Sequence, residues 1–104
     1  MVEPLEVRFT QDFVDWLDRL KDRRARRSVE ARIDRLQAGN LGDAKPVGDA
    51  ISELRIDQGP GYRVYFTKID RIVVVLLCGG DKSTQQRDIA LAKLLAAKLR
   101  SELP

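Results

Sequence analysis

Histidine is absent from this 104-residue sequence, and cysteine, aromatic residues and long apolar runs are scarce. Without histidine, the chain lacks the usual general base for nuclease, protease or esterase chemistry near neutral pH. One cysteine and no paired carboxylates at metal-ligand spacing also argue against a metal site, so we expect neither a metal nor another cofactor. Any catalysis must therefore use Arg, Lys, Asp or Tyr.

The one cysteine, Cys78, ends the longest unbroken apolar run, residues 72–78. It cannot form an internal disulfide, and because no histidine is present to activate it we interpret it as a buried, inert thiol in a reducing cytoplasm. The run is far shorter than the ~20 residues that span a bilayer. With no N-terminal apolar segment typical of secretion, the sequence predicts a cytoplasmic protein without a membrane partner.

The composition suits a single domain over residues 1–104. Apolar residues make up 43% of the chain, which is enough for one modest core. The 19 Lys and Arg residues exceed the 16 Asp and Glu residues, and the net charge is +3. This mild basic excess favours a polyanionic partner without proving one.

The periodicity of apolar residues predicts a mixed α+β fold in the order β-α-α-β-β-β-α. Strands are expected at 5–9, 52–57, 62–67 and 72–78, and helices at 11–20, 25–38 and 84–100. Residues 39–50, rich in glycine, are predicted to form a loop. The first two helices should form a hairpin on one face of a small, mainly antiparallel sheet in which 72–78 is central. Ser83, three residues before Gln86, predicts a capping box for the C-terminal helix.

Two arginines stand on the polar face of the predicted meander, within SELRIDQGPGYRVYF at residues 52–66. Alternation puts one face of the hairpin in the core, while the other carries Arg55, Arg63 and Tyr65. On neighbouring antiparallel strands the two guanidinium groups repel each other unless an anion binds between them or Glu53 bridges both. We favour the first interpretation, a phosphate held against the sheet.

Two further segments have alternative interpretations. In GGDKST, residues 79–84, Asp81 stands where a phosphate-binding loop needs glycine, so the segment is either a weak phosphate site at a helix start or a plain connection. Between Arg19 and Arg35, basic residues are interleaved with Asp and Glu. This run is either a nucleic-acid-binding face or, as we favour, a solvated helix surface with i,i+4 ion pairs.

With these residues in place, the chain resembles the RelE/ParE superfamily of type II toxin–antitoxin toxins, and in particular its phage-derived addiction module killer branch, near the HigB toxins. The resemblance is most specific in SELRIDQGPGYRVYF and in LLCGGDKSTQQRDI, residues 76–89. It implies a small sheet cradled by a helical hairpin, a cognate antitoxin and, for RelE-like members, metal-independent cleavage of mRNA on the ribosome. ParE-like members instead inhibit DNA gyrase without nuclease chemistry.

The same resemblance implies roles for individual residues. Arg63 in GYR matches the arginine assigned to the scissile phosphate, Arg55 in ELR matches a basic position on the preceding strand, and Lys82 lies where the last strand approaches the site. Tyr65 would stack on a base. Further RNA contacts are expected from basic residues outside this group: Lys45, Lys68 and Arg87. The last helix ends in LRSELP and lacks the C-terminal Tyr or His that many RelE members place near the leaving group.

The first hypothesis is therefore an endoribonuclease toxin that inhibits translation. The alternatives are a non-catalytic inhibitor of DNA gyrase and an antitoxin-binding domain without nuclease activity. The toxin hypothesis includes a small, net-acidic antitoxin that contacts either the last helix, residues 89–99, or the face that carries Arg55 and Arg63.

Overall fold

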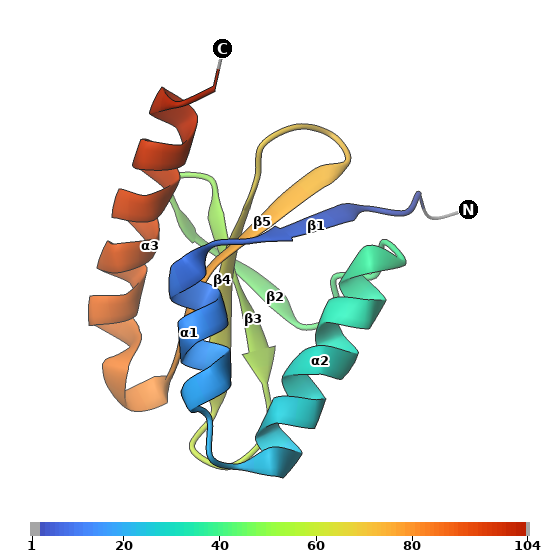
Figure 1. Ribbon diagram of the computed structural model, residues 1–104, viewed down its shortest axis with the longest axis vertical. Helices are drawn as coiled ribbons and strands as arrows, with labels where there is room; N and C mark the ends of the chain where they lie inside the picture. Colours follow the sequence, from blue (N-terminus) through green and yellow to red (C-terminus); the bar gives the residue numbers. More distant parts are fainter. Residues whose placement is uncertain (1–2, 104) are drawn as a thin grey trace.

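The computed structural model describes residues 3–103 as a five-stranded sheet with helices on both faces (Figure 1). The elements follow one another as β1 (Glu6–Phe9), α1 (Gln11–Arg19), α2 (Arg23–Gln37), β2 (Ala44–Gly48), β3 (Ile51–Ile56), β4 (Tyr62–Lys68), β5 (Val73–Asp81), the short 3-10 helix η1 (Lys82–Thr84) and α3 (Gln85–Ser101). The predicted α+β class is confirmed, with one strand more than expected. Within residues 3–103, no helix combines the length and the apolar character needed to cross a bilayer.

The strand order is β1-β5-β4-β3-β2, with β1 parallel to β5 and the other neighbouring pairs antiparallel. The apolar run is central, as predicted, because β5 lies between β1 and β4. One residue is inserted in β5: Tyr65 pairs with Cys78 and Phe66 with Leu76, so Leu77 has no opposite residue and forms a bulge. As a result, Leu77 and Cys78 both belong to the core beneath α3.

The first core lies between the sheet and the α1–α2 hairpin. The hydroxyl of Thr10 caps α1 by accepting a hydrogen bond from the Phe13 amide, and the carboxylate of Asp22 caps α2. Helical spacing then places the apolar side chains of both helices on the sheet. The buried members of this core are Phe13, Val29, Ile33 and Leu36 from the helices and Leu54, Ile56, Val64, Phe66, Val74 and Leu76 from the strands.

The second core lies on the opposite face of the sheet, under α3. Ala92 and Ala96 are buried there and pack against strand residues that include Ile51, Tyr65 and Leu77. Small alanine side chains let the helix axis approach the sheet closely, and the apolar area that each one buries is modest. The helix thus covers the middle of the sheet and leaves its end, near η1, uncovered.

Two local predictions are wrong. Residues 44–48 are the edge strand β2, which pairs with β3, and not part of a loop. Pro46 hid this strand, but an edge strand tolerates proline because its outer amides need no partner. The capping box also lies two residues earlier than expected: Asp81 accepts from the Ser83 amide, and Thr84 Oγ1 accepts from the Asp81 amide. It therefore starts η1, from which α3 continues.

Gly79 gives a test of the packing between β5 and α1. A Cβ at this position would lie 2.3 Å from Trp16 Cε3, far inside van der Waals contact. We predict that Gly79→Ala lowers the free energy of unfolding by about 1–3 kcal/mol, because the indole must move. Urea unfolding measures the change, and adding Trp16→Leu should recover part of it. Equal stability of Gly79→Ala and the wild type would contradict this packing.

Candidate functional site

Arg55, Arg63 and Lys82 line one cleft of about 400 Å³, where β3 turns into β4 and β5 runs into η1. Arg55 and Arg63 are directly opposite each other in the antiparallel register. Gly61 lies between two of these residues, because a Cβ there would contact Arg63 Nη1 at 3.4 Å and Lys82 Cβ at 3.7 Å. Its φ of +78° also favours glycine. The fold thus brings together the three residues predicted to be catalytic.

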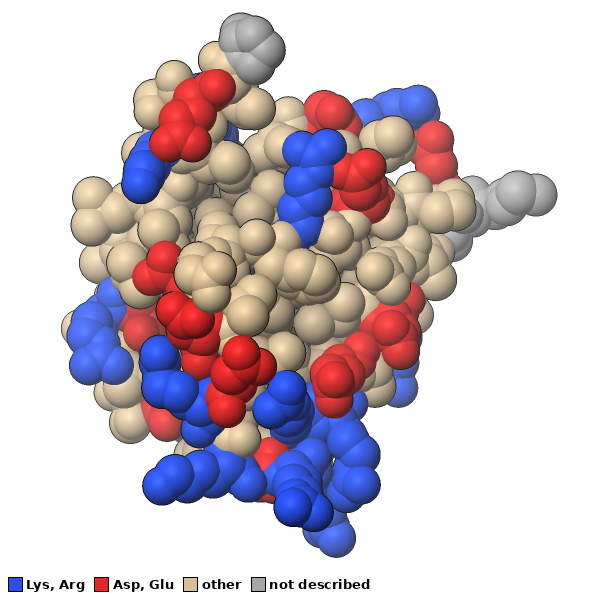
Figure 2. Space-filling view, viewed as in Figure 1, with Lys and Arg blue, Asp and Glu red and all other residues tan. Residues whose placement is uncertain are grey.

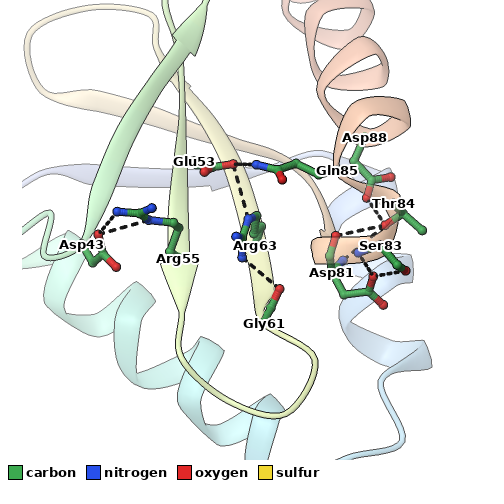
Figure 3. A network of polar contacts seen from close by, with 10 residues as sticks. All are labelled: Asp43, Glu53, Arg55, Gly61, Arg63, Asp81, Ser83, Thr84, Gln85 and Asp88. Atoms are coloured by element: carbon green, nitrogen blue, oxygen red, sulfur yellow. Dashed lines mark hydrogen bonds and ion pairs between the residues drawn. The ribbon is translucent and has the colours of Figure 1, made fainter.

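Arg63 is held from two sides (Figure 3). Its Nη1 donates to the Gly61 carbonyl at 3.0 Å, and its Nε lies 3.7 Å from Glu53 Oε2, too far for a hydrogen bond. Both side chains are largely buried, with 13% of Arg63 and 3% of Glu53 exposed. Glu53 Oε2 also accepts a hydrogen bond of 2.9 Å from Gln85 Nε2, at the first residue of α3. Glu53 therefore approaches Arg63 and does not bridge both arginines.

Arg55 has its own carboxylate, Asp43, on the segment that enters β2. Asp43 Oδ1 accepts from Arg55 Nη2 at 3.0 Å and from Nε at 3.3 Å (Figure 3). Arg32 of α2 ties this segment to β3 by donating to the carbonyls of Arg55 and Leu41 at 2.7 and 3.0 Å. Burial and the charge of nearby Arg35 lower the pKa of Arg32 from its ordinary value. Arg32 is thus a structural clamp and not part of an open cationic face.

Lys82 is exposed at the start of η1, on the opposite side of the cleft from Arg55. The preceding Asp81 fixes this turn, because its carboxylate accepts from both the amide and the hydroxyl of Ser83. The hydrogen bond from the Ser83 hydroxyl is the main reason that the pKa of Asp81 is lowered. The ammonium of Lys82 therefore extends from a rigid turn.

The prediction that Tyr65 stacks on a base is wrong for this fold. Tyr65 is 0% exposed and lies in the core beneath α3. Arg63 projects from the same face of β4, but two residues closer to the β3–β4 turn, where it borders the cleft. Burial, followed by the carboxylates of Glu53 and Asp88, raises the pKa of the Tyr65 hydroxyl. Tyr65 is therefore a neutral core residue, and its hydroxyl has no hydrogen-bond partner among residues 3–103.

The other three residues predicted to contact RNA are exposed but do not line the cleft. Lys45 lies on β2 opposite Glu53, one strand away from the arginines. Lys68 is the last residue of β4, at the end of the strand far from the β3–β4 turn. Arg87 lies on α3, with its Nε 3.8 Å from Asp88 Oδ1. Only Lys45 and Arg87 are thus at the same end of the molecule as the cleft.

Figure 2 shows Lys and Arg side chains gathered at the lower end of the molecule, where the α1–α2 corner lies. We call this surface the basic end and define it as the Lys and Arg residues from the end of α1 to the first turns of α2: Arg19, Lys21, Arg23, Arg24, Arg26 and Arg27. Ser28 Oγ lies 3.4 Å from Gln58 Oε1, which places the start of α2 beside the β3–β4 turn and the cleft. Among residues 3–103, the basic end makes one ion pair, Arg26 with Asp18 at 3.4 Å. The expected series of i,i+4 pairs is absent there.

Three polar residues near the cleft were not identified from the sequence: Asp43, Asp57 and Gln85. Asp57 lines the cleft. Asp43 accepts a hydrogen bond from Arg55, and Gln85 donates one to Glu53. Asp43 and Arg55 are 12 residues apart, and Gln85 and Glu53 are 32 apart, so no local periodicity connects them. No cluster of three or more His, Cys, Asp or Glu suited to a metal is found in residues 3–103. Cys78 is buried, and burial raises its pKa to about 12, so it is a poor nucleophile.

Comparison with known sequences gives a family and a relative. The model of the family described as Phage derived protein Gp49-like (DUF891) matches residues 15–100. An uncharacterized protein of Haemophilus influenzae is 55% identical over 95 residues, which are 91% of this chain and 96% of that protein.

Two solved structures are similar to this chain. A chain of the toxin–antitoxin complex RelBE2 from Mycobacterium tuberculosis has a TM-score of 0.60 and 26% identity, and the match covers 77% of this chain and 100% of that one. The E. coli toxin RelE, an arginine double mutant in the free state, has a TM-score of 0.68 and 15% identity over 88% of this chain and 96% of that one. The predicted resemblance to a phage-derived branch with the RelE fold is confirmed.

Tyr65→Phe tests whether the buried Tyr65 hydroxyl lacks a hydrogen-bond partner. Because the variant removes a buried hydroxyl without a protein partner, we predict that the free energy of unfolding is unchanged or rises by up to about 1 kcal/mol. Denaturant unfolding measures it, with Tyr62→Phe on the other face as the matched control. A loss greater than about 1 kcal/mol would show that the hydroxyl makes a hydrogen bond, for example to buried water.

Proposed function

Because the chain belongs to the Phage derived protein Gp49-like family and has the fold of RelE, we propose that it is the toxin of a type II toxin–antitoxin system and cleaves mRNA on the ribosome without a metal. The observation that best supports this proposal is the cleft that groups Arg55, Arg63 and Lys82 beside the basic end. Positive side chains around a hollow orient a phosphodiester and stabilise its charge. The chemistry proposed for this cleft needs no histidine.

In the proposed reaction the RNA supplies its own nucleophile. The 2′-hydroxyl gives up its proton to water as its oxygen attacks the adjacent phosphorus, and the bond from phosphorus to the 5′-oxygen of the next nucleotide breaks. The products carry a 2′,3′-cyclic phosphate and a 5′-hydroxyl. Arg55 and Arg63 hold the phosphate and stabilise the charge that develops on its oxygens. Lys82 neutralises that charge or donates a proton to the departing 5′-oxygen.

The basic end is the surface proposed to bind ribosomal RNA. Its six Lys and Arg side chains lie on one corner of the molecule, next to the cleft, and their charges are nearly free of carboxylate partners among residues 3–103. Phosphate contacts of this kind supply affinity without reading sequence. Docking through this corner would present the cleft to a message held on the same particle.

The proposed partner in the resting cell is a small, net-acidic antitoxin. RelBE2 was solved as a complex of toxin and antitoxin, which supports a partner of this type for a chain with the same fold. An acidic segment complements the cleft and the basic end. A partner could also compete for the sheet under α3, because Ala92 and Ala96 bury less apolar area than larger residues would.

Substitutions in the cleft test the proposed nuclease directly. We predict that Lys82→Ala lowers the single-turnover rate of mRNA cleavage on programmed ribosomes by about 100-fold, the scale for removing one preorganised stabilising group. Arg63→Lys should also cleave more slowly, because it keeps a cation beside Glu53 but not the planar fork. Arg71→Ala is the matched control, since Arg71 is 81% exposed and lies outside the cleft.

The melting temperature of each variant separates a damaged site from a damaged fold. Lys82 is exposed, so its replacement should leave stability within about 0.5 kcal/mol. Full cleavage by folded Lys82→Ala and Arg63→Lys proteins would contradict the assignment of this cleft. Intact mRNA together with DNA double-strand breaks on induction of the wild type would instead favour gyrase inhibition.

Charge reversal at the basic end tests its proposed binding to the ribosome. We predict that Arg23→Glu combined with Arg24→Glu weakens co-sedimentation with ribosomes. The log–log slope of binding against salt should fall by roughly 0.7–0.9 for each phosphate that the variant no longer neutralises. The change should not unfold α2, because glutamate is favourable at a helix N-terminus. Arg71→Glu combined with Lys98→Glu makes the same charge change elsewhere and should bind as the wild type does. Equal binding by both double variants would remove the basic end from the proposal.

A further inference from the structure

Glu53 is an ionisable group in an unusual place. It belongs to β3, is 2% exposed and lies behind the cleft, away from bulk solvent. Burying a carboxylate is costly unless charges or hydrogen bonds compensate. Among residues 3–103, its oxygens accept one hydrogen bond, from Gln85 Nε2 at 2.9 Å, and have one ion-pair partner, Arg63 Nε at 3.7 Å. The burial of Glu53 is therefore explained by what it does to Arg63.

We propose that Glu53 is a positioning residue for Arg63, held in place by Gln85; this inference rests on the proposed function. The guanidinium is planar and has three nitrogens. Nη1 is bound to the Gly61 carbonyl and Nε faces Glu53, so contacts on two sides fix the plane of the group. Nη2, which has no protein partner among residues 3–103, is left for the phosphate. Figure 3 shows Arg63 between Glu53 and Gly61.

We expect the 3.7 Å separation between Arg63 Nε and Glu53 Oε2 to shorten when substrate binds. Arg63 Nε is buried and has no hydrogen-bond partner among residues 3–103. Catalytic hydrogen bonds are often long in free enzymes and shorten in the substrate complex. A phosphate that draws on Nη2 makes the guanidinium a stronger donor at Nε, and the nearest acceptor is Glu53 Oε2. Glu53 thereby contributes to the alignment of Arg63, and Gln85 links that alignment to the start of α3.

The first arm of the test is kinetic. Glu53→Gln keeps the shape of the side chain and removes its charge. It should bind programmed ribosomes as tightly as the wild type and cut mRNA about 10- to 100-fold more slowly in a single turnover, the scale of a misplaced catalytic group. Combining it with Arg63→Lys should slow cleavage little further, because both changes act on one group. Glu102→Gln, an exposed change at the end of α3, is the matched control.

A second pair of variants covers the case in which Glu53→Gln fails to fold. Gln85→Ala removes the hydrogen bond to Glu53 at a helical position that favours alanine, and it should slow cleavage about 3-fold or more without weakening binding. Gln86→Ala, the exposed neighbour, should cleave at the wild-type rate. Wild-type rates for Glu53→Gln or for Gln85→Ala, or rate reductions that multiply with Arg63→Lys, would overturn the inference.

The second arm does not depend on cleavage. In ¹H–¹⁵N spectra of the arginine Nε–H groups, Glu53→Gln should shift the Arg63 signal and leave the Arg71 signal in place. An unshifted Arg63 signal would overturn the role of Glu53. If the wild type does not cut mRNA while the Arg63 signal shifts, the proposed function fails and the orientation of Arg63 by Glu53 stands.

Discussion

Strands β4 and β5 are buried on both faces, and the rest of the architecture follows from this constraint. All side chains from Val64 to Thr67 and from Val73 to Cys78 are buried. The α1–α2 hairpin must therefore cover one face and α3 the other. The helix α3 begins at Gln85 and does not cover the end of the sheet next to the β3–β4 turn. Arg55 and Arg63 lie at this end, on the face that α3 covers elsewhere. The cationic cleft lies at the open end of these covered central strands.

The positive charges around the cleft are fixed by neighbouring carboxylates, so the cleft carries little net positive charge. Arg55 is paired with Asp43, Arg63 faces Glu53, and Lys82 extends from a turn that Asp81 fixes. A cleft of this kind orients a phosphate well but has little excess positive charge to attract a polymer. The basic end has that excess, since Arg26 is its one ion-paired member within residues 3–103. In the proposed function, the α1–α2 corner therefore attracts the RNA and the cleft aligns its phosphate.

Features that depend on local pattern could be predicted from the sequence. The run from Ile72 to Cys78 predicts a central strand, and alternation places Arg55 and Arg63 side by side on one face, as found. Alternation does not reveal what covers a face, which is why Tyr65 was expected to be open and is buried. The position of α3 depends on its packing against strands that are distant in the sequence. The pattern of any one segment therefore does not predict it.

The remaining differences have equally specific causes. Pro46 and the flanking glycines conceal β2, whose pairing with β3 is a tertiary contact at a sheet edge. Asp43 and Gln85 reach their partners across turns and helices, so their roles appear once the chain is folded. The Arg-rich run was expected to be compensated by its own acidic residues, but Asp22 caps α2, Asp15 accepts a hydrogen bond from Gln11, and Arg26 with Asp18 is the one ion pair of the run within residues 3–103.

The central claim is that the cleft aligns an RNA phosphodiester for cleavage by the neighbouring 2′-hydroxyl. Sequencing the 5′ ends of cellular transcripts after induction tests it most directly, with a ligation step that selects 5′-hydroxyl ends. The account predicts new 5′-hydroxyl ends inside translated reading frames for the wild-type protein and their absence for a folded Lys82→Ala variant. Growth arrest by the wild type with no such ends, or the same ends for both proteins, would contradict it.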